Sequence, residues 1–167
     1  MKRIGFGQVE PNHLSAQRNG QIYGQLAASK TAFPTNIENG RFAKYDYAAN
    51  EVNLSGDGEW MLVLNEVKLY DDAWRVSYKD YVMTPDNNGE MYPRLFKTNV
   101  GDIFTTNTIG DGTSDVSVAA GNYLVVGSNG YLTVNSTKPE ADTMAWKVVK
   151  VYTMPDGQPG VKIQRIQ

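Results

Sequence analysis

The stretch Gly121–Val134, Gly-Asn-Tyr-Leu-Val-Val-Gly-Ser-Asn-Gly-Tyr-Leu-Thr-Val, decides the fold of this chain. Its two apolar runs, Tyr123–Val126 and Tyr131–Val134, are rich in the aromatic and β-branched residues that favour strands. Ser128-Asn129-Gly130 lies between them, and an Asn-Gly pair in this position is the strongest short-range signal of a β-hairpin. We therefore predict an antiparallel hairpin whose Asn129-Gly130 turn has two residues or a close variant, with Gly130 at positive φ.

The chain from residue 37 onward repeats this alternation of short apolar runs and turns. Trp60–Leu64 is a continuous apolar run, which predicts a central strand buried on both faces. Trp74, Val76 and Tyr78 alternate with polar residues, a pattern typical of a strand with one solvated face. We predict an all-β fold, a small β-barrel or sandwich of about eight to ten short strands with an extended N-terminal arm. The expected core contains Trp60, Leu62, Leu64, Leu124, Leu132, Trp146 and Val148.

The composition of the chain limits the classes of protein to which it could belong. At 167 residues and 20% charged residues, the chain has the size and composition of one globular domain. It contains no cysteine, which excludes disulfides and thiol chemistry. No apolar run reaches the length of a membrane span, so no membrane partner is expected. Residues 1–36 carry a net charge of +3 against −5 for the remainder, which suggests contact with an acidic neighbouring surface.

Residues 1–36 differ in composition from the part that follows. They are rich in Gly, Gln, Asn, Ser and Ala, with isolated apolar residues, and Asn19-Gly20 argues against a long helix between Leu14 and Leu26. We predict an extended arm over 1–36 and a β-barrel or sandwich domain over 37–167, the arm being mobile alone and ordered on a partner. A flexible terminus with no partner is the alternative. The predicted partner-binding anchors of the arm are Arg3, Phe6, Leu14, Arg18, Tyr23 and Phe33.

The sequence contains no pattern of residues typical of an enzyme. His13 is the only histidine, and a general base needs a positioned partner, so we expect a solvated side chain. Asp86–Glu90 and Asp111–Asp115 offer oxygen ligands but lack the spacing of a calcium-binding EF-hand loop. We predict no catalytic, cofactor-binding or metal-binding residue, although a pair of carboxylates that meets only in space stays open. The acidic body disfavours nucleic acid as a partner.

Three segments resemble small structural proteins of tailed-phage heads. They are Gly5–Arg18, Val148–Lys162 and Ile37-Glu38-Asn39-Gly40-Arg41-Phe42, the last resembling a hairpin near the start of phage capsid cement proteins. The resemblance implies a non-enzymatic decoration or cement protein, made in the host cytoplasm and located on the capsid surface of the virion. It would bind the outer surface of the capsid and stabilise contacts between subunits. The implied partner is the major capsid protein, and self-association, for example as a trimer, stays open.

A carbohydrate-binding β-sandwich module that takes part in host adsorption is the alternative from another class of protein. Such a module needs exposed aromatic side chains gathered on one face, because sugar rings stack on them. The candidate residues are Tyr45, Tyr47, Tyr78 and Tyr81.

Overall fold

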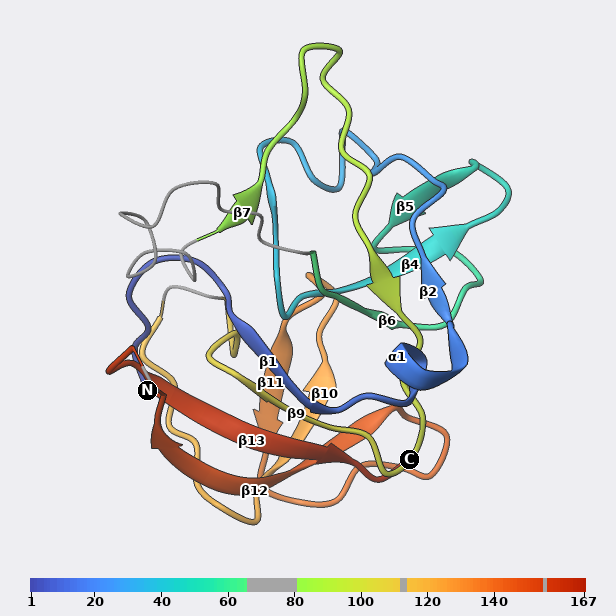
Figure 1. Cartoon of the computed structure of the whole chain (residues 1–167). Coiled ribbons are helices and arrows are strands. Elements are labelled where there is room, and N and C mark those ends of the chain that lie inside the picture. The colour runs from blue at the N-terminus through green and yellow to red at the C-terminus, as the bar shows by residue number, and fades with distance from the viewer. Residues whose placement is uncertain (66–80, 112–113, 155) are drawn as a thin grey trace.

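The computed structural model describes residues 1–65, 81–111, 114–154 and 156–167, and this part of the chain is almost entirely β-structure (Figure 1). It contains one helix, α1 (Ser15–Asn19). The strands are β1 (Val9–His13), β2 (Ile22–Tyr23), β3 (Ile37–Glu38), β4 (Phe42–Asp46), β5 (Glu51–Asn53), β6 (Met61–Val63), β7 (Val82–Met83), β8 (Leu95–Phe96), β9 (Ile103–Thr106), β10 (Tyr123–Val126), β11 (Leu132–Asn135), β12 (Ala145–Thr153) and β13 (Pro159–Arg165). The all-β prediction is confirmed, and the predicted strand through Trp74 and Tyr78 lies outside the described residues.

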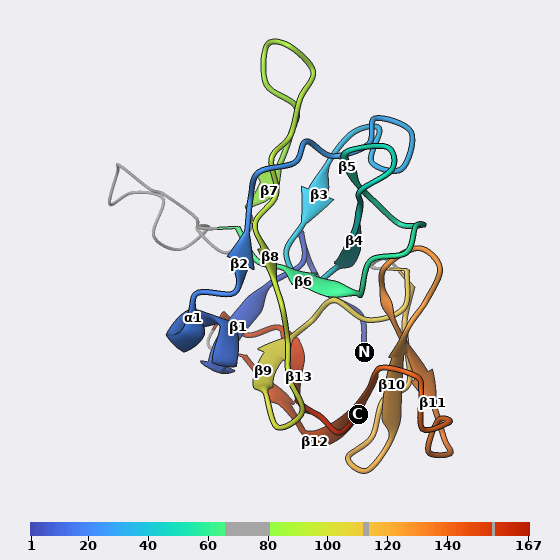
Figure 2. The same ribbon diagram turned by 90° about the vertical axis from the view of Figure 1, so that its right-hand side faces the viewer.

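The strands form antiparallel sheets that face each other. The larger sheet has six strands in the order β1-β9-β13-β12-β10-β11, and the second has five in the order β2-β8-β6-β4-β5. A third sheet pairs β3 with β7. Figure 2 shows the six-stranded sheet below the five-stranded one. Both sheets are open, so the described residues form a sandwich-like arrangement and not a closed barrel.

The predicted hairpin is present as β10 and β11. Gly127 and Tyr131 close it, because the Gly127 N–H donates to the Tyr131 carbonyl at 2.7 Å. The loop thus has three residues and not two, and Gly130 has φ 79°. A residue with positive φ at the third loop position adds the bulge that lets a common turn fit a twisted hairpin. The prediction of positive φ at Gly130 is confirmed.

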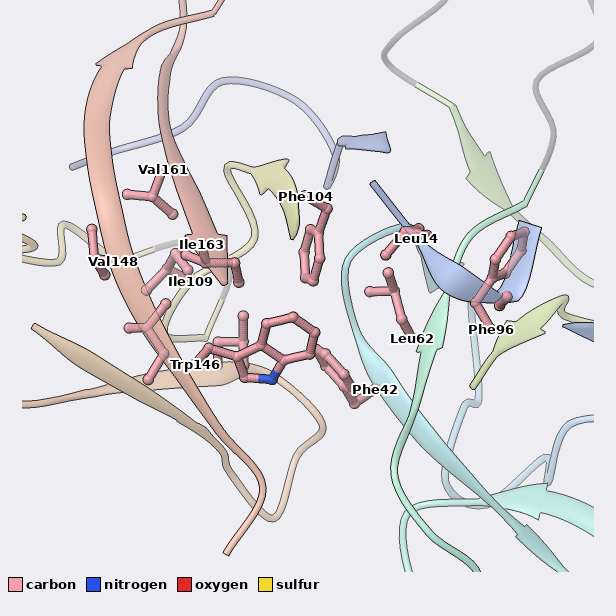
Figure 3. Close-up of a cluster of buried hydrophobic side chains, with 13 residues drawn as sticks. Leu14, Phe42, Leu62, Phe96, Phe104, Ile109, Trp146, Val148, Val161 and Ile163 are labelled. Atoms are coloured by element: carbon pink, nitrogen blue, oxygen red, sulfur yellow. The ribbon is translucent and has the colours of Figure 1, made fainter. Parts of the chain in front are cut away.

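The main core lies between the two large sheets and is centred on Trp146 (Figure 3). Its ring centroid lies 4.9 Å from that of Phe104 on β9 and 5.8 Å from that of Phe42 on β4. One indole therefore contacts both sheets. Of the core residues predicted from the sequence, Leu62, Leu124, Leu132, Trp146 and Val148 are buried, and Trp60 and Leu64 are partly buried against them.

A second core covers the other face of the five-stranded sheet. It contains Phe33, Ile37, Val52 and Leu95 together with Met61 and Val63 of β6. Leu62, between those two β6 residues, belongs to the main core. The central strand β6 is thus buried on both faces, as its continuous apolar run predicted.

The prediction of an extended arm separate from the β domain is wrong for residues 9–36. Strand β1 pairs with β9 at the edge of the six-stranded sheet, and β2 pairs with β8 in the five-stranded sheet. Helix α1 ends at Gly20, whose φ of 73° caps it. Apolar residues that are sparse along this segment still reach the cores, because Leu14 and Ala16 enter the first and Ala28 and Phe33 enter the second. Residue 36 is therefore not a domain boundary.

Candidate binding surface

Residues 1–8 are attached to the fold through Glu38 on β3. The Nη2 atom of Arg3 lies 2.8 Å from Glu38 Oε2, and the side chains are only 8% and 3% exposed. The Gly7 N–H donates to the same carboxylate at 2.7 Å, and the Tyr131 hydroxyl also donates to it. A buried charge is stable only when it is paired and hydrogen-bonded, and Glu38 meets both conditions. The N-terminal residues are therefore part of the folded structure.

Two further contacts hold this segment on either side of Arg3. The Ile4 N–H donates to Gln158 Oε1 at 2.8 Å, in the turn between β12 and β13. The terminal amino group of Met1 pairs with Asp115, and this ion pair holds the pKa of Asp115 below its usual value. The backbone of residues 1–8 is thus fixed at several points.

The same fixed segment exposes two large apolar side chains. Ile4 is 76% exposed and Phe6 is 38% exposed, although Gly7 and the neighbouring Gln8 are buried. We call Ile4 and Phe6 the N-terminal ledge. Because their backbone is already ordered, a partner that covers them gains apolar burial without a large loss of chain entropy. The ledge is a candidate binding surface.

The other predicted anchors have different positions. Leu14 and Phe33 are core residues whose side chains are only 2% and 1% exposed. They pack inside the protein, so the prediction that they fill pockets on a partner is wrong. Tyr23 is half-buried and packs edge-on against Tyr45 at 5.7 Å between ring centroids. Arg18 is exposed, with Nη2 3.3 Å from Nε2 of His13.

Arg41 and Tyr131 complete the polar cluster at Glu38. The Arg41 guanidinium stacks on the rings of Phe33 and Tyr131, 4.8 Å from each centroid. Burial lowers the pKa of Arg41. Burial and the hydrogen bond to Glu38 raise the pKa of Tyr131 to about 12. The cluster joins β3, the residue before β4 and the β10–β11 hairpin. No periodicity in the sequence indicates it, because its members meet only in the folded chain.

An aromatic hollow of about 240 Å³ contains two of the tyrosines predicted for sugar binding. It is lined by Tyr23, Tyr45, Tyr47, Gly58, Glu59, Met61 and Lys97. Tyr47 is 75% exposed, whereas the ring of Tyr45 is buried and stands edge-on to it, 5.9 Å away. Lys97 Nζ forms an ion pair of 2.6 Å with Glu59. Tyr81 is half-buried, and Tyr78 lies outside the described residues.

A larger hollow of about 400 Å³ lies beside α1 and β8. It is lined by Pro11, Gln17, Ile22, Leu64, Asn65, Arg94 and Phe96. Its apolar floor is formed by Ile22, Leu64 and Phe96, and its polar groups are amides and the Arg94 guanidinium, which lies 5.5 Å from the centroid of the Phe96 ring. Such a lining suits an apolar side chain of a partner.

Asp86 and Asp111, one in each of the two loops considered for calcium, accept hydrogen bonds from backbone groups of their own loop. Asp86 accepts hydrogen bonds from the N–H groups of Asn88 and Glu90 at 2.9 and 2.8 Å. Asp111 accepts from the Ser114 N–H at 2.7 Å. Among the described residues, no group of three or more His, Cys, Asp or Glu side chains could hold a metal ion. Asp86 therefore stabilises the turn at Asn87–Gly89 through its own carboxylate.

Comparison of the chain with protein-family models, curated proteins and solved structures gives no match. Within the described part of the chain, no helix has both the length and the apolar character to cross a membrane.

Proposed function

We propose that this protein is a non-enzymatic virion structural protein that decorates the outer surface of a phage capsid and stabilises contacts between capsid subunits. The resemblance of Gly5–Arg18, Ile37–Phe42 and Val148–Lys162 to phage-head proteins suggests the class. The observation that carries the proposal is the N-terminal ledge, where Ile4 and Phe6 project from a backbone held by Glu38 and Gln158.

The proposed mechanism is mechanical. Covering each ledge side chain contributes about 1.5 to 3 kcal/mol at most, so one copy would bind weakly through the ledge alone. Many copies on a lattice, each in contact with two subunits, would resist separation of those subunits because several weak contacts must break together. The major capsid protein is the proposed partner, and further copies of this chain could adjoin it on the lattice.

The test is copurification with assembled particles. Virions are purified on a density gradient, and the bound protein is quantified after mixing them with wild-type or variant chain. The double variant Ile4→Ser and Phe6→Ser should bind at least about tenfold more weakly, since tenfold corresponds to a loss of about 1.4 kcal/mol of apolar contact. Val100→Ser is the matched control, because Val100 is an exposed apolar residue elsewhere on the surface. Absence of the wild-type chain from the particle fraction would contradict the proposal.

A carbohydrate-binding module is the second candidate, favoured by the aromatic hollow. Exposed Tyr47 offers a ring face for stacking, and Glu59 and Lys97 offer hydrogen bonds to hydroxyl groups. A glycan bound there would change the tyrosine and tryptophan fluorescence of the wild-type chain and not that of Tyr47→Ala. A decoration protein would sediment with particles and show no such change.

A further inference from the structure

Strand β12 extends beyond its neighbour β10. It pairs with β13 from Trp146 to Thr153, but with β10 only from Ala145 to Lys147. The last bonds on the β10 side join Val148 to Asn122 and Gly121, at 2.8 Å each. The Ala119–Asn122 turn ends the ladder there, since the Asn122 N–H donates back to the Ala119 carbonyl at 3.1 Å. Residues 149–153 continue without a strand on that side among the described residues.

The pairing register shows which backbone groups face the open side. The Met154 N–H donates to the Gln158 carbonyl at 2.7 Å, so these two residues form a hydrogen-bonded pair. Bonded and non-bonded pairs alternate along an antiparallel ladder, so Val151 and Thr153 are in non-bonded pairs with Val161 and Pro159. Their N–H and C=O groups therefore point away from β13. Among the described residues, none of the hydrogen bonds of turns and loops involves these groups.

The open edge also has exposed apolar side chains. Val149 is 50% exposed and Val151 is 39% exposed. An unpaired edge with apolar side chains is a template for the addition of another strand, and proteins usually protect such an edge. Here the edge lies at the end of the sheet that also contacts Ile4 through Gln158.

The charges around the edge indicate the chemistry of the partner. Lys150 lies directly opposite Lys162, and like charges in this position destabilise a sheet. Strands β10, β12 and β13 contain Lys147, Lys150, Lys162 and Arg165 and no acidic residue, although the whole chain has a net charge of −2. An acidic side chain on an added strand would lie opposite Lys150 on its free side and supply the missing opposite charge.

We propose that the Val149–Thr153 edge of β12 binds an extended segment of a partner protein that places Asp or Glu opposite Lys150. Backbone hydrogen bonds from Val151 and Thr153 would hold the segment, and Val149 and Val151 would pack against its apolar side chains. This inference concerns the chemistry of the partner and holds whether or not the partner is a capsid protein.

The experiment titrates the ¹⁵N-labelled full chain with two blocked peptides, Thr-Val-Glu-Val-Glu-Val-Thr and its counterpart with Lys in place of Glu. The Glu peptide should shift the amide signals of Val151 and Thr153 and slow their hydrogen exchange. The Lys peptide should bind about tenfold more weakly, because it places a positive charge opposite the partly exposed Lys150 in place of a negative one. Lys150→Glu should reverse the preference, whereas Lys138→Glu, a change at an exposed loop lysine, should leave it unchanged.

Val151→Pro supplies an independent test. Proline at position 151 removes a backbone N–H that donates no hydrogen bond to β13, and proline is tolerated in edge strands. The fold should therefore be kept, whereas binding of the Glu peptide should be lost. Equal binding of both peptides, or binding that survives both Lys150→Glu and Val151→Pro, would overturn the proposal. Self-association of the peptide-free chain that Val151→Pro abolishes would also overturn it, because the occupant would then be a second copy.

Discussion

The carbonyl oxygen of Gly130 accepts a hydrogen bond of 2.7 Å from the backbone N–H of Phe42. Gly130 belongs to the hairpin of the six-stranded sheet, and Phe42 begins β4 in the five-stranded sheet. A Cβ atom at Gly130 would lie 2.3 Å from the Phe42 carbonyl oxygen, closer than any real contact. At Gly130 the backbone of the hairpin therefore lies directly against the backbone of β4, and glycine is required there for space as well as for φ.

Gly130→Ala should lower the free energy of unfolding by about 3 kcal/mol, because it adds backbone strain and displaces the bond to Phe42. Gly101→Ala is the matched control, since Gly101 has φ 96° and a Cβ atom added there would have no neighbouring atom within 4 Å. It should cost only about 1 kcal/mol. Urea unfolding of both variants measures the difference, and equal losses would contradict the close approach of the hairpin to β4.

Leu14→Ala should lower the free energy of unfolding by about 2 to 5 kcal/mol, because it leaves a cavity in the main core. Ile4→Ala, a change of an exposed residue in the same N-terminal segment, should change it by less than about 0.5 kcal/mol. Deletion of residues 2–30 should prevent stable folding, in contrast to what a separate arm would allow. Retention of the wild-type melting temperature after the deletion would show that these residues are dispensable to the core.

Arg3→Met should cost about 3 kcal/mol, because it leaves the Glu38 carboxylate buried without its direct ion-pair partner. Arg18→Met changes an exposed arginine in the same way and should cost less than about 0.5 kcal/mol. Chemical denaturation at neutral pH compares them. A combined variant, Arg3→Met with Glu38→Gln, should regain part of the loss, and failure to do so would count against an ion-pair role.

Ionisation of Tyr131 should lower the free energy of unfolding at alkaline pH. Its pKa is about 12 in the folded state and 10.0 is its ordinary value. The folded state thus keeps a proton that the unfolded state releases, so this contribution is fully present below pH 10 and is lost as pH rises toward 12. The loss amounts to about 1 to 2 kcal/mol, less than the full shift implies, because solvent screens a partly exposed side chain. Unfolding measured from pH 8 to 12 should show a steeper decline for the wild type than for Tyr131→Phe, and parallel curves would refute the shift.

Local patterns in the sequence were sufficient to predict the central strand β6 and the β10–β11 hairpin. The apolar run Trp60–Leu64 and the hairpin Tyr123–Val134 each contain the residues that determine their local conformation, since strand and turn preferences act over a few neighbouring residues. The all-β class, the positive φ of Gly130 and the burial of Leu62 and Trp146 could therefore be predicted.

Only the tertiary structure decided the role of the N-terminal residues and the surfaces available to partners. Leu14 and Phe33 are isolated apolar residues in a polar segment, a pattern typical of an arm, yet each fills a core formed by strands far away in the chain. Ile4 has the same local pattern and is exposed. The pairing of Arg3 with Glu38 likewise depends on which distant segments meet. So does the edge at Val151, which has no neighbouring strand on its β10 side among the described residues. Burial is a property of surfaces brought together by the whole fold, so composition along the chain cannot distinguish an anchor for a partner from a residue of the core.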